Sequence, residues 1–580
     1  RTAPPPPTTT PRCRGSSPIC RGSFSSVPTV VTPRESEFAS AAPRARMGTL
    51  PTAACVLGAL LALAAYAAAV HALYAVSEVR ELTPAQLGVA CFYALVLAAW
   101  AGVEAGFLTD KLSPKYTALE LTESDAEEQT KFADAASGTD YDAKPVPETA
   151  VLGVTRDKLP ALRAAAEFVV IMGYVYVCDR TVLVPKGPKT ADMSKFWLLN
   201  GLILLCALLT LRPSRGMSED THAKPLQRDQ TEEWKGWMQL MFILYHYFAA
   251  ADIYNAIRLY IAAYVWMTGF GNFSYYYIKQ DFTLVRFAQM MWRLNFFVFF
   301  VCVTMNNEYM LYYICPMHTF FTWLVYLTLW LRNHLNGSSV FLLLKMVMVT
   351  ALTLALYHLP GAFRATFAPA APLLAFHDPL HPEFTDALHE WYFRSKLDHL
   401  VWIFGMLCAF CFPWYDGCLE YLESFGRPTR IAMRATLLAA VFAIGACWYV
   451  TTFTLPKREY NAVHPYSSWI PILCYIVLRN LTPVMRRCSM HLFSWCGKVT
   501  LETYILQFHI WMKTTGLNGS PKHLMVWIPD WYWLNLALTS AVFLAVSYRV
   551  FQITVVLRDA CIPKDAAALG TRTAAAAAAA

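Results

Sequence analysis

Residues 234–273 decide the fold, and they read WKGWMQLMFILYHYFAAADIYNAIRLYIAAYVWMTGFGNF. This stretch holds two long apolar runs, and a helix needs about 20 mainly apolar residues to cross the hydrocarbon core of a bilayer. The ionisable and amide residues His246, Asp252, Asn255 and Arg258 lie within and between the runs. A charge at the bilayer centre costs about 2.5–3.5 kcal/mol even on a lenient insertion scale. Such residues are therefore candidates for function.

The rest of the 580-residue chain has the same apolar character. Residues of the AVILMFWYC set make up 56%, charged residues make up 15%, and the mean hydropathy is +0.36, which is more apolar than a typical soluble domain. The formal net charge is +8, but most Lys and Arg residues lie in short connections between apolar runs, as membrane topology requires. We expect membrane lipid around the chain and no nucleic-acid partner.

Apolar stretches long enough to cross a bilayer recur about fourteen times. The sequence therefore predicts an all-α, polytopic integral membrane helical bundle with about 13–14 transmembrane helices around a ten-helix core. The expected spans are 53–76, 87–108, 162–184, 196–211, 236–251, 257–277, 284–305, 309–331, 340–358, 396–413, 431–453, 467–482, 490–512 and 531–551.

Composition also predicts how the chain is divided. Residues 1–46 are rich in Pro, Ser, Thr and Arg without an apolar period, which predicts a disordered tail; Met47 is an alternative start of translation. The first span is either a signal anchor or a cleaved signal peptide. The further predicted segments are two N-terminal spans in 47–108, an acidic disordered cytosolic loop in 109–160, two spans and a basic loop in 161–230, the ten-span core in 231–558, and a disordered Ala-rich tail in 559–580.

The distribution of Lys and Arg predicts the orientation, because short cytosolic loops carry more of these residues than loops on the other side. If the loop before Trp237 is cytosolic, the cytosolic loops hold more Lys and Arg than the opposite loops do. We therefore expect both termini in the cytosol and residues 359–395 on the lumenal side.

Ionisable side chains recur in later apolar runs, and they predict a shared polar pocket. His246 lies eleven residues after Lys235, near mid-membrane depth at ~1.5 Å per residue, and an imidazole there can accept and return a proton. Pro316 interrupts a helix beside His318, which favours a cavity. Asp252 lies six residues before Arg258. An alternative to a functional role is that these two residues form a structural ion pair.

Helical spacing extends this set, since positions seven apart, such as Glu502 and His509, share a helix face. For each residue alone, an interhelical hydrogen bond explains its presence equally well. The predicted catalytic residues are His246, Glu308, His318, Glu502 and His509. The predicted substrate-binding residues are Lys235, Asp252, Asn255, Arg258, Arg293, Asn307, Tyr313, Glu390, Arg394, Asp398, His464, Tyr504 and Gln507.

The 16 cysteines lie mainly in apolar runs, where cysteine acts as a small hydrophobic residue. Cys408 and Cys411 form a Cys-x-x-Cys sequence without a second pair nearby. A zinc site needs four suitable ligands or three and a water, so we expect no metal.

Several blocks closely resemble the plant reduced wall acetylation proteins. They include QTEEWKGWMQ from residue 230, YHYFAAADIYNAIR from 245, NNEYMLYYICPMHT from 306, HPYSSWIP from 464 and GKVTLETYILQFHIW from 497. That family is grouped with the animal sialic acid O-acetyltransferase and the fungal capsule acetylation protein as ten-transmembrane acyltransferases. The resemblance, over about residues 82–563, implies a Golgi membrane O-acetyltransferase that uses acetyl-CoA and acts on cell-wall polysaccharides such as xylan, mannan, xyloglucan and pectin.

A looser similarity reaches the acyltransferase-3 superfamily, whose first core helix carries a basic residue, ten positions and a histidine. Lys235 and His246 match this spacing, with Lys in place of the usual Arg. Because Lys is a point charge and not a bidentate fork, the match is weaker at that position. The similarity implies His246 as the acyl-transfer base and Lys235 as a contact to a CoA phosphate near the cytosolic face.

The animal relative also carries a lumenal hydrolase-like domain with a Gly-Asp-Ser block, which this sequence lacks. We therefore expect lumenal polysaccharide O-acetyltransferases as partners, beside the polysaccharide acceptor. Two alternatives remain open: a transporter that feeds acetyl-CoA or another acetyl donor to such enzymes, and a scaffold that recruits them without catalysis.

Overall fold

The computed structural model describes residues 49–78, 81–111, 150–152, 154–214 and 223–562. The tail predicted for 1–46 lies outside these ranges, as do most of the segments predicted to be disordered in 109–160 and 559–580. Two boundaries need correction. Residues 150–151 and 154–155 pair as short strands, with Val151 buried against Cys55, Val103 and Phe107, and the last helix continues to Cys561.

Long apolar helices dominate the described residues, which confirms the all-α membrane fold class. Seven helices are long and apolar enough to cross a membrane, and an eighth candidate combines His389–Phe410 with Phe412–Ser424, two segments bent by 55°. The seven are α1 (Thr49–Val76), α2 (Pro84–Lys111), α4 (Leu159–Arg180), α8 (Leu284–Met305), α10 (Ser339–His358), α16 (Arg427–Trp448) continued by the π-helical η5 (Tyr449–Phe453), and α22 (Tyr532–Cys561).

The other helices of the described residues are shorter or more polar, so fewer helices than the predicted fourteen meet the criteria for a full span. The stretch 490–512, for example, divides into four segments. These helices are α5 (Met193–Leu209), α6 (Arg228–Tyr247), η1 (Ala251–Ile253), α7 (Tyr254–Lys279), η2 (Tyr309–Tyr312), α9 (Ile314–Trp330), η3 (Asn333–Gly337), α11 (Ala362–Phe367), η4 (Ala368–Ala370), α12 (Ala371–Leu374), α13 (His389–Leu397), α14 (Val401–Phe410), α15 (Phe412–Ser424), α17 (Lys457–Ser467), α18 (Trp469–Arg479), α19 (Pro483–Arg487), α20 (His491–Cys496), η6 (Gly497–Val499), α21 (Thr500–Leu506) and the π-helical η7 (Gln507–Trp511).

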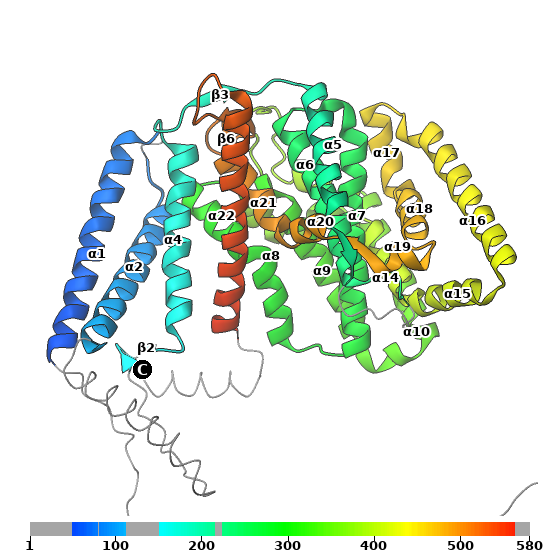
Figure 1. The fold of residues 1–580 in the computed structure, drawn as a ribbon, viewed down its shortest axis with the longest axis horizontal. Helices are drawn as coiled ribbons and strands as arrows, with labels where there is room; N and C mark the ends of the chain where they lie inside the picture. The colour runs from blue at the N-terminus through cyan, green and yellow to red at the C-terminus, as the bar shows by residue number, and fades with distance from the viewer. Residues whose placement is uncertain (1–48, 79–80, 112–149, 153, 215–222, 563–580) are drawn as a thin grey trace, which may run out of the picture. The chain divides into compact units, whose positions relative to one another are not determined.

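The few strands are short and act as ties between distant segments. β1 (Ala150–Val151) pairs with β2 (Val154–Thr155), and β4 (Leu211–Pro213) pairs with β5 (Cys488–Met490). A three-stranded antiparallel sheet has the order β3-β7-β6, from Lys186–Pro188, Pro521–Met525 and Met512–Thr514. It joins the connection between α4 and α5 to the chain just before α22, at one end of the bundle (Figure 1).

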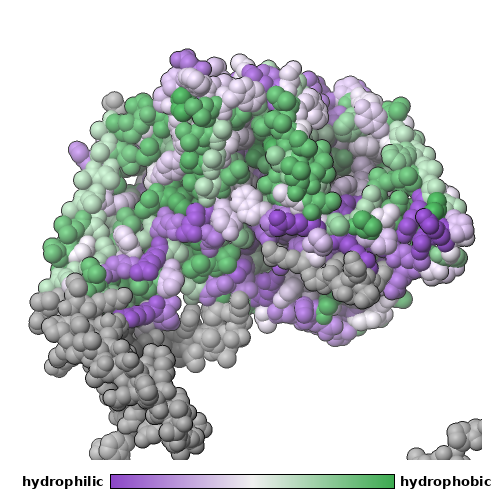
Figure 2. Space-filling model, in the orientation of Figure 1, coloured by the Kyte–Doolittle hydropathy of each residue, from purple (hydrophilic) through white to green (hydrophobic). Residues whose placement is uncertain are grey.

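The arrangement places the polar helices inside the apolar ones. Helix α1 packs on α2, α2 packs on α4, and α4 packs on α22, which is distant in sequence (Figure 1). Within the bundle, α6 packs on α20 and α7 packs on both α9 and α14. Leucines face outward on α5, where Leu202, Leu205 and Leu209 are 50%, 56% and 80% exposed. Figure 2 shows such apolar side chains over α1 and α5. Exposed apolar surface of this extent is the surface that lipid covers.

Glycines allow a close contact between two helices in the core. On α7, a Cβ placed on Gly269 would lie 2.0 Å from the carbonyl oxygen of Trp402 in α14. In return, a Cβ on Gly405 of α14 would lie 2.3 Å from the carbonyl oxygen of Trp266. Small residues at such positions let helix backbones approach each other, which is how helices associate in a membrane.

We predict that Gly269→Ala destabilises the protein by about 1–3 kcal/mol, because the added methyl group forces α7 and α14 apart. Gly271→Ala is the matched control on the same helix, since a Cβ there meets no atom within 4 Å. The measurement is the heat stability of the detergent-purified protein by size-exclusion chromatography. Equal stability of the two variants would contradict the close contact.

Candidate functional site

A cavity of about 400 Å³ opens at the end of the bundle where the β3-β7-β6 sheet lies. It is lined by aromatic rings, by five basic side chains, by two carboxylates and by His246. The aromatic residues are Phe242, Tyr245, Tyr254, Tyr313, Phe376, Phe393, Tyr504 and Phe508. The charged residues are Lys189, Arg258, Arg394, Lys457, Lys522, Asp378 and Glu390. A concave site with apolar walls and a few converging polar groups is the usual form of a ligand pocket.

His246 enters the cavity from the last turn of α6, and one neighbour fixes its tautomer. Its Nδ1 lies 3.2 Å from Oε1 of Gln507. The amide nitrogen of Gln507 donates to the carbonyl oxygen of Tyr504 at 3.0 Å, so Oε1 faces the imidazole and must accept from an Nδ1–H. In neutral His246, Nε2 then carries the lone pair and has no hydrogen-bond partner among the described residues, as a general base requires.

The basic side chains give the cavity positive charge. Arg394 pairs with Glu390 at 3.0 Å and lies 4.4 Å over the ring centroid of Tyr313. Lys189 donates to the carbonyl oxygen of Pro521 at 3.0 Å. Burial, and to a smaller extent the nearby charge of Lys522, lowers the pKa of Lys189 to about 8. A cation held where its charged form is disfavoured marks a candidate ligand-binding position.

Arg258 is bound into the cavity wall by a network of buried residues. Its Nη2 lies 2.7 Å from Oδ2 of Asp398, whose Oδ1 lies 3.4 Å from Nε2 of His464. This corrects the alternative that Asp252 pairs with Arg258. Asp252 lies in the short η1 turn and is exposed, whereas Asp398 sits at the buried break between α13 and α14 that packs toward α7.

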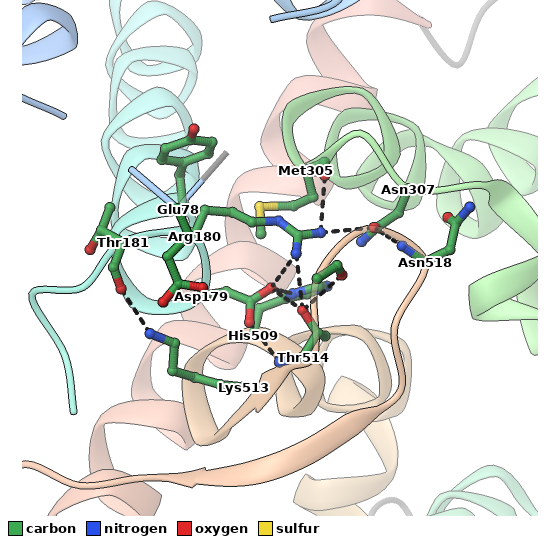
Figure 3. Close-up of polar contacts among 12 residues, drawn as sticks. Glu78, Asp179, Arg180, Thr181, Met305, Asn307, His509, Lys513, Thr514 and Asn518 are labelled. Carbon is green, nitrogen blue, oxygen red and sulfur yellow. Dashed lines mark hydrogen bonds and ion pairs between the residues drawn. The ribbon is translucent and has the colours of Figure 1, made fainter. Parts of the chain in front are cut away.

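His509 belongs to a second, closed polar cluster (Figure 3). Its Nδ1 donates to Oδ2 of Asp179 at 2.8 Å, and its Nε2 accepts from the hydroxyl of Tyr312 at 2.6 Å. Asp179 also accepts from the backbone N–H and the hydroxyl of Thr514 at 2.7 and 2.8 Å. The side chains of His509 and Asp179 are 0% exposed. Both ring nitrogens of His509 are therefore committed, and the structure does not bring His509 into the cavity.

Asn307 belongs to the same cluster. Its Oδ1 accepts from Nη2 of Arg180 at 2.8 Å, and its amide group donates to the Tyr312 hydroxyl at 3.0 Å. Arg180 also donates to Thr514 at 3.1 Å. The cluster thus connects α4, the end of α8 and the β6 segment (Figure 3).

The other three predicted catalytic residues have separate local partners. Nδ1 of His318 lies 2.7 Å from the hydroxyl of Thr268. Glu502 forms a bidentate ion pair with Arg293, with one contact at 3.0 Å. The carboxylate of Glu308 accepts from the backbone N–H and from Nδ1 of His377 at 2.8 and 2.7 Å. The prediction of a single shared chamber is therefore wrong for these residues. Each of them has its hydrogen-bond or ion-pair partner elsewhere in the protein.

Eight predicted binding residues lie outside the cavity lining: Lys235, Asp252, Asn255, Arg293, Asn307, Asp398, His464 and Gln507. Lys235, the expected contact to a CoA phosphate, is paired with Glu232 at 2.8 Å. Asn255 donates to the carbonyl oxygens of Phe453 and Leu455 at 2.8 and 3.0 Å, where it holds the end of η5.

The structure thus brings six of the predicted residues together in the cavity lining. They are His246, Arg258, Tyr313, Glu390, Arg394 and Tyr504. Sequence reasoning did not select Lys189, Lys457, Ser520 and Lys522, which also line it. Lys189, Ser520 and Lys522 lie in connections between helices, and Lys457 begins α17. A lysine at such a position looks like an ordinary topology signal.

Comparisons with known proteins bear on the family of the chain. Residues 76–574 match the family described as "10 TM Acyl Transferase domain found in Cas1p". The chain belongs to this Cas1p-type acyltransferase family. The N-acetylneuraminate (7)9-O-acetyltransferase of Danio rerio is 32% identical to this Cas1p-type chain over 435 residues, which cover 72% of the chain and 53% of that protein. The chain thus spans about half the length of this curated relative. No solved structure matches it.

We predict that Lys189 makes the stability of this Cas1p-type protein depend on pH. Its pKa is about 8 in the folded state, against an ordinary value of 10.5 for lysine, so the unfolded chain binds more protons between these values and stability rises there with pH. The rise is at most about 3 kcal/mol. Heat stability measured from pH 7 to 10 should show this component in the wild type and lose it in Lys189→Met.

Lys195→Met is the control, because Lys195 is on the same end of the bundle and pairs with Asp192 at 2.9 Å. A pH profile of Lys189→Met that is identical to the wild-type profile would contradict the burial of a cation at this position.

We predict further that Asp179→Ala destabilises the protein by about 3–5 kcal/mol, because it leaves a buried ion-pair and hydrogen-bond network without its acceptor. Tyr312→Phe removes only one hydrogen bond and should cost about 1 kcal/mol. Thermal unfolding in detergent measures both. If Asp179→Ala is as stable as Tyr312→Phe, the carboxylate does not organise this cluster.

Proposed function

We propose that this chain is a membrane O-acetyltransferase component that uses cytosolic acetyl-CoA to support O-acetylation of cell-wall polysaccharides in the Golgi lumen. The observation that carries the proposal is His246, presented in an open cavity with Nδ1 bound to Gln507 and Nε2 free. Membership of the acyltransferase family and the acetyltransferase name of the relative support the reaction class. The sequence blocks similar to the plant reduced wall acetylation proteins support the polysaccharide acceptor.

The proposed reaction uses Nε2 of His246 as the general base. An acceptor hydroxyl attacks the thioester carbonyl of acetyl-CoA while Nε2 of His246 takes its proton. The carbon–sulfur bond then breaks, the acetyl group remains on the acceptor oxygen as an ester, and the thiolate of CoA leaves and receives the proton. The acceptor is the polysaccharide itself or a hydroxyl of a lumenal O-acetyltransferase that acts as a partner.

The position of the cavity supports a lumenal acceptor. Its lining includes Arg394 and Phe376, which lie in the connection that the Lys and Arg distribution assigns to the lumen. Lys189, Lys457 and Lys522 come from loops assigned to the same side. We therefore propose a multi-pass Golgi protein with cytosolic termini, whose cavity opens toward the glycan.

A transporter of the acetyl donor is the second candidate. The bent pair His389–Phe410 and Phe412–Ser424 and the π-helical segments η5 and η7 favour it, because interrupted helices line the substrate sites of many transporters. Proteoliposomes given acetyl-CoA labelled in both its acetyl and its nucleotide part separate the two functions. A transporter accumulates both labels together, whereas an acetyltransferase moves only the acetyl label to the acceptor.

We predict that His246→Ala lowers acetyl transfer from labelled acetyl-CoA by about 10²–10⁴-fold at normal protein levels, because it removes the general base. Gln507→Met should lower it by up to about tenfold through loss of one orienting hydrogen bond. His334→Ala, an exposed residue of η3 outside the cavity, is the control and should keep full activity. Full activity of His246→Ala would remove His246 from the mechanism.

A further inference from the structure

The cavity holds buried polar atoms that the described residues leave without hydrogen bonds. They are Nε and Nη1 of Arg258, the hydroxyl of Tyr504 and the hydroxyl of Ser520. Arg258 and Tyr504 are only 1% and 3% exposed. A buried polar group without a partner costs about 1–3 kcal/mol. Several such groups around one cavity indicate that a ligand supplies the missing partners.

The available groups are mainly donors with positive charge. Asp398 occupies one end of the Arg258 guanidinium, so its remaining N–H donors are unused. Arg394 is shared with Glu390. The three lysines of the lining have no carboxylate within ion-pair distance among the described residues. Lys189 donates to a carbonyl oxygen, and Lys457 lies 4.7 Å over the ring centroid of Tyr254. Lys522 is exposed.

The lining of the cavity therefore carries a net positive charge. Five basic residues face two acidic ones in the lining, and one of the acids, Glu390, is already paired. Lys189 and Lys522 also lie close enough to influence each other electrostatically. Two neighbouring cations repel each other unless an anion lies between or beside them.

We propose that this cavity binds a ligand through an anionic oxygen group, with Lys189 and Lys522 at its mouth and Arg258 in its wall. The inference deepens the proposed acetyl transfer by naming the chemistry of a substrate. The anionic group is a carboxylate on the acceptor sugar, as in a uronic acid, if the mouth faces the lumen as proposed above, and a phosphate of the acetyl donor if the mouth faces the cytosol. Both are oxygen anions that Arg and Lys bind, and the two sources differ in what else the ligand contains.

Direct binding to the purified full chain tests the proposal without relying on turnover. The four probes are a tetragalacturonate, its neutral methyl ester, CoA, and pantetheine, which lacks the phosphates. Each is titrated by microscale thermophoresis at low and high salt against the wild type and the double variant Lys189→Gln, Lys522→Gln. Lys186→Gln is the matched control, because Lys186 belongs to the same sheet, pairs with Glu78 at 2.7 Å and does not line the cavity.

We expect one charged probe to bind more tightly than its neutral counterpart and to lose about tenfold in affinity in the double variant, with the neutral probe unchanged. Loss for tetragalacturonate assigns the anion to the acceptor, and loss for CoA assigns it to the donor. High salt should weaken the same interaction. The inference is overturned if neither charged probe binds better than its neutral counterpart, or if Lys186→Gln causes an equal loss. Anion binding without any acetyl transfer would refute the proposed function and leave this inference standing.

Discussion

A polar group buried in a membrane protein must find its partner inside the protein, because hydrocarbon offers none. This constraint organises most of the interior. Asp179 holds His509, Asp398 holds Arg258, and Glu502 holds a cation from α8. The groups that stay unpaired are consequently informative, since each of them carries an uncompensated cost. Four of the unpaired atoms among the described residues line one cavity, beside Nε2 of His246, and a ligand in this cavity can supply their missing partners.

Regular apolar helices were predictable from the sequence, because their length and composition are local properties. The span expected at 284–305 coincides with α8 (Leu284–Met305), and that expected at 340–358 differs from α10 (Ser339–His358) by one residue. The stretch 490–512 was expected as one span and divides into α20, η6, α21 and η7, because bends and π-helical turns depend on tertiary packing. The family resemblance supplied the reaction class, which periodicity alone does not contain.

The site was predictable only in part. Helical position selected His246, Arg258 and Arg394 correctly as members of one pocket. It could not separate them from His509, because the deciding contact with Asp179 joins residues 330 positions apart. The loop lysines were missed for a different reason. A lysine in a short connection fits the charge bias of membrane loops whether or not it also faces a cavity. Only the structure shows that Lys522 lines the cavity and that Lys186 does not.

The π-helical turn η7 has a mechanical consequence for both polar regions. Gln507 steadies His246 on one side of Phe508, while His509 locks onto Asp179 on the other. A π-helical turn holds more residues than an α-helical turn, so it changes the directions in which its side chains point. The contacts of Gln507 and His509 therefore both depend on this wide turn. The π-helical turn thus lets Gln507 orient His246 in the cavity while His509 binds Asp179 in the closed cluster.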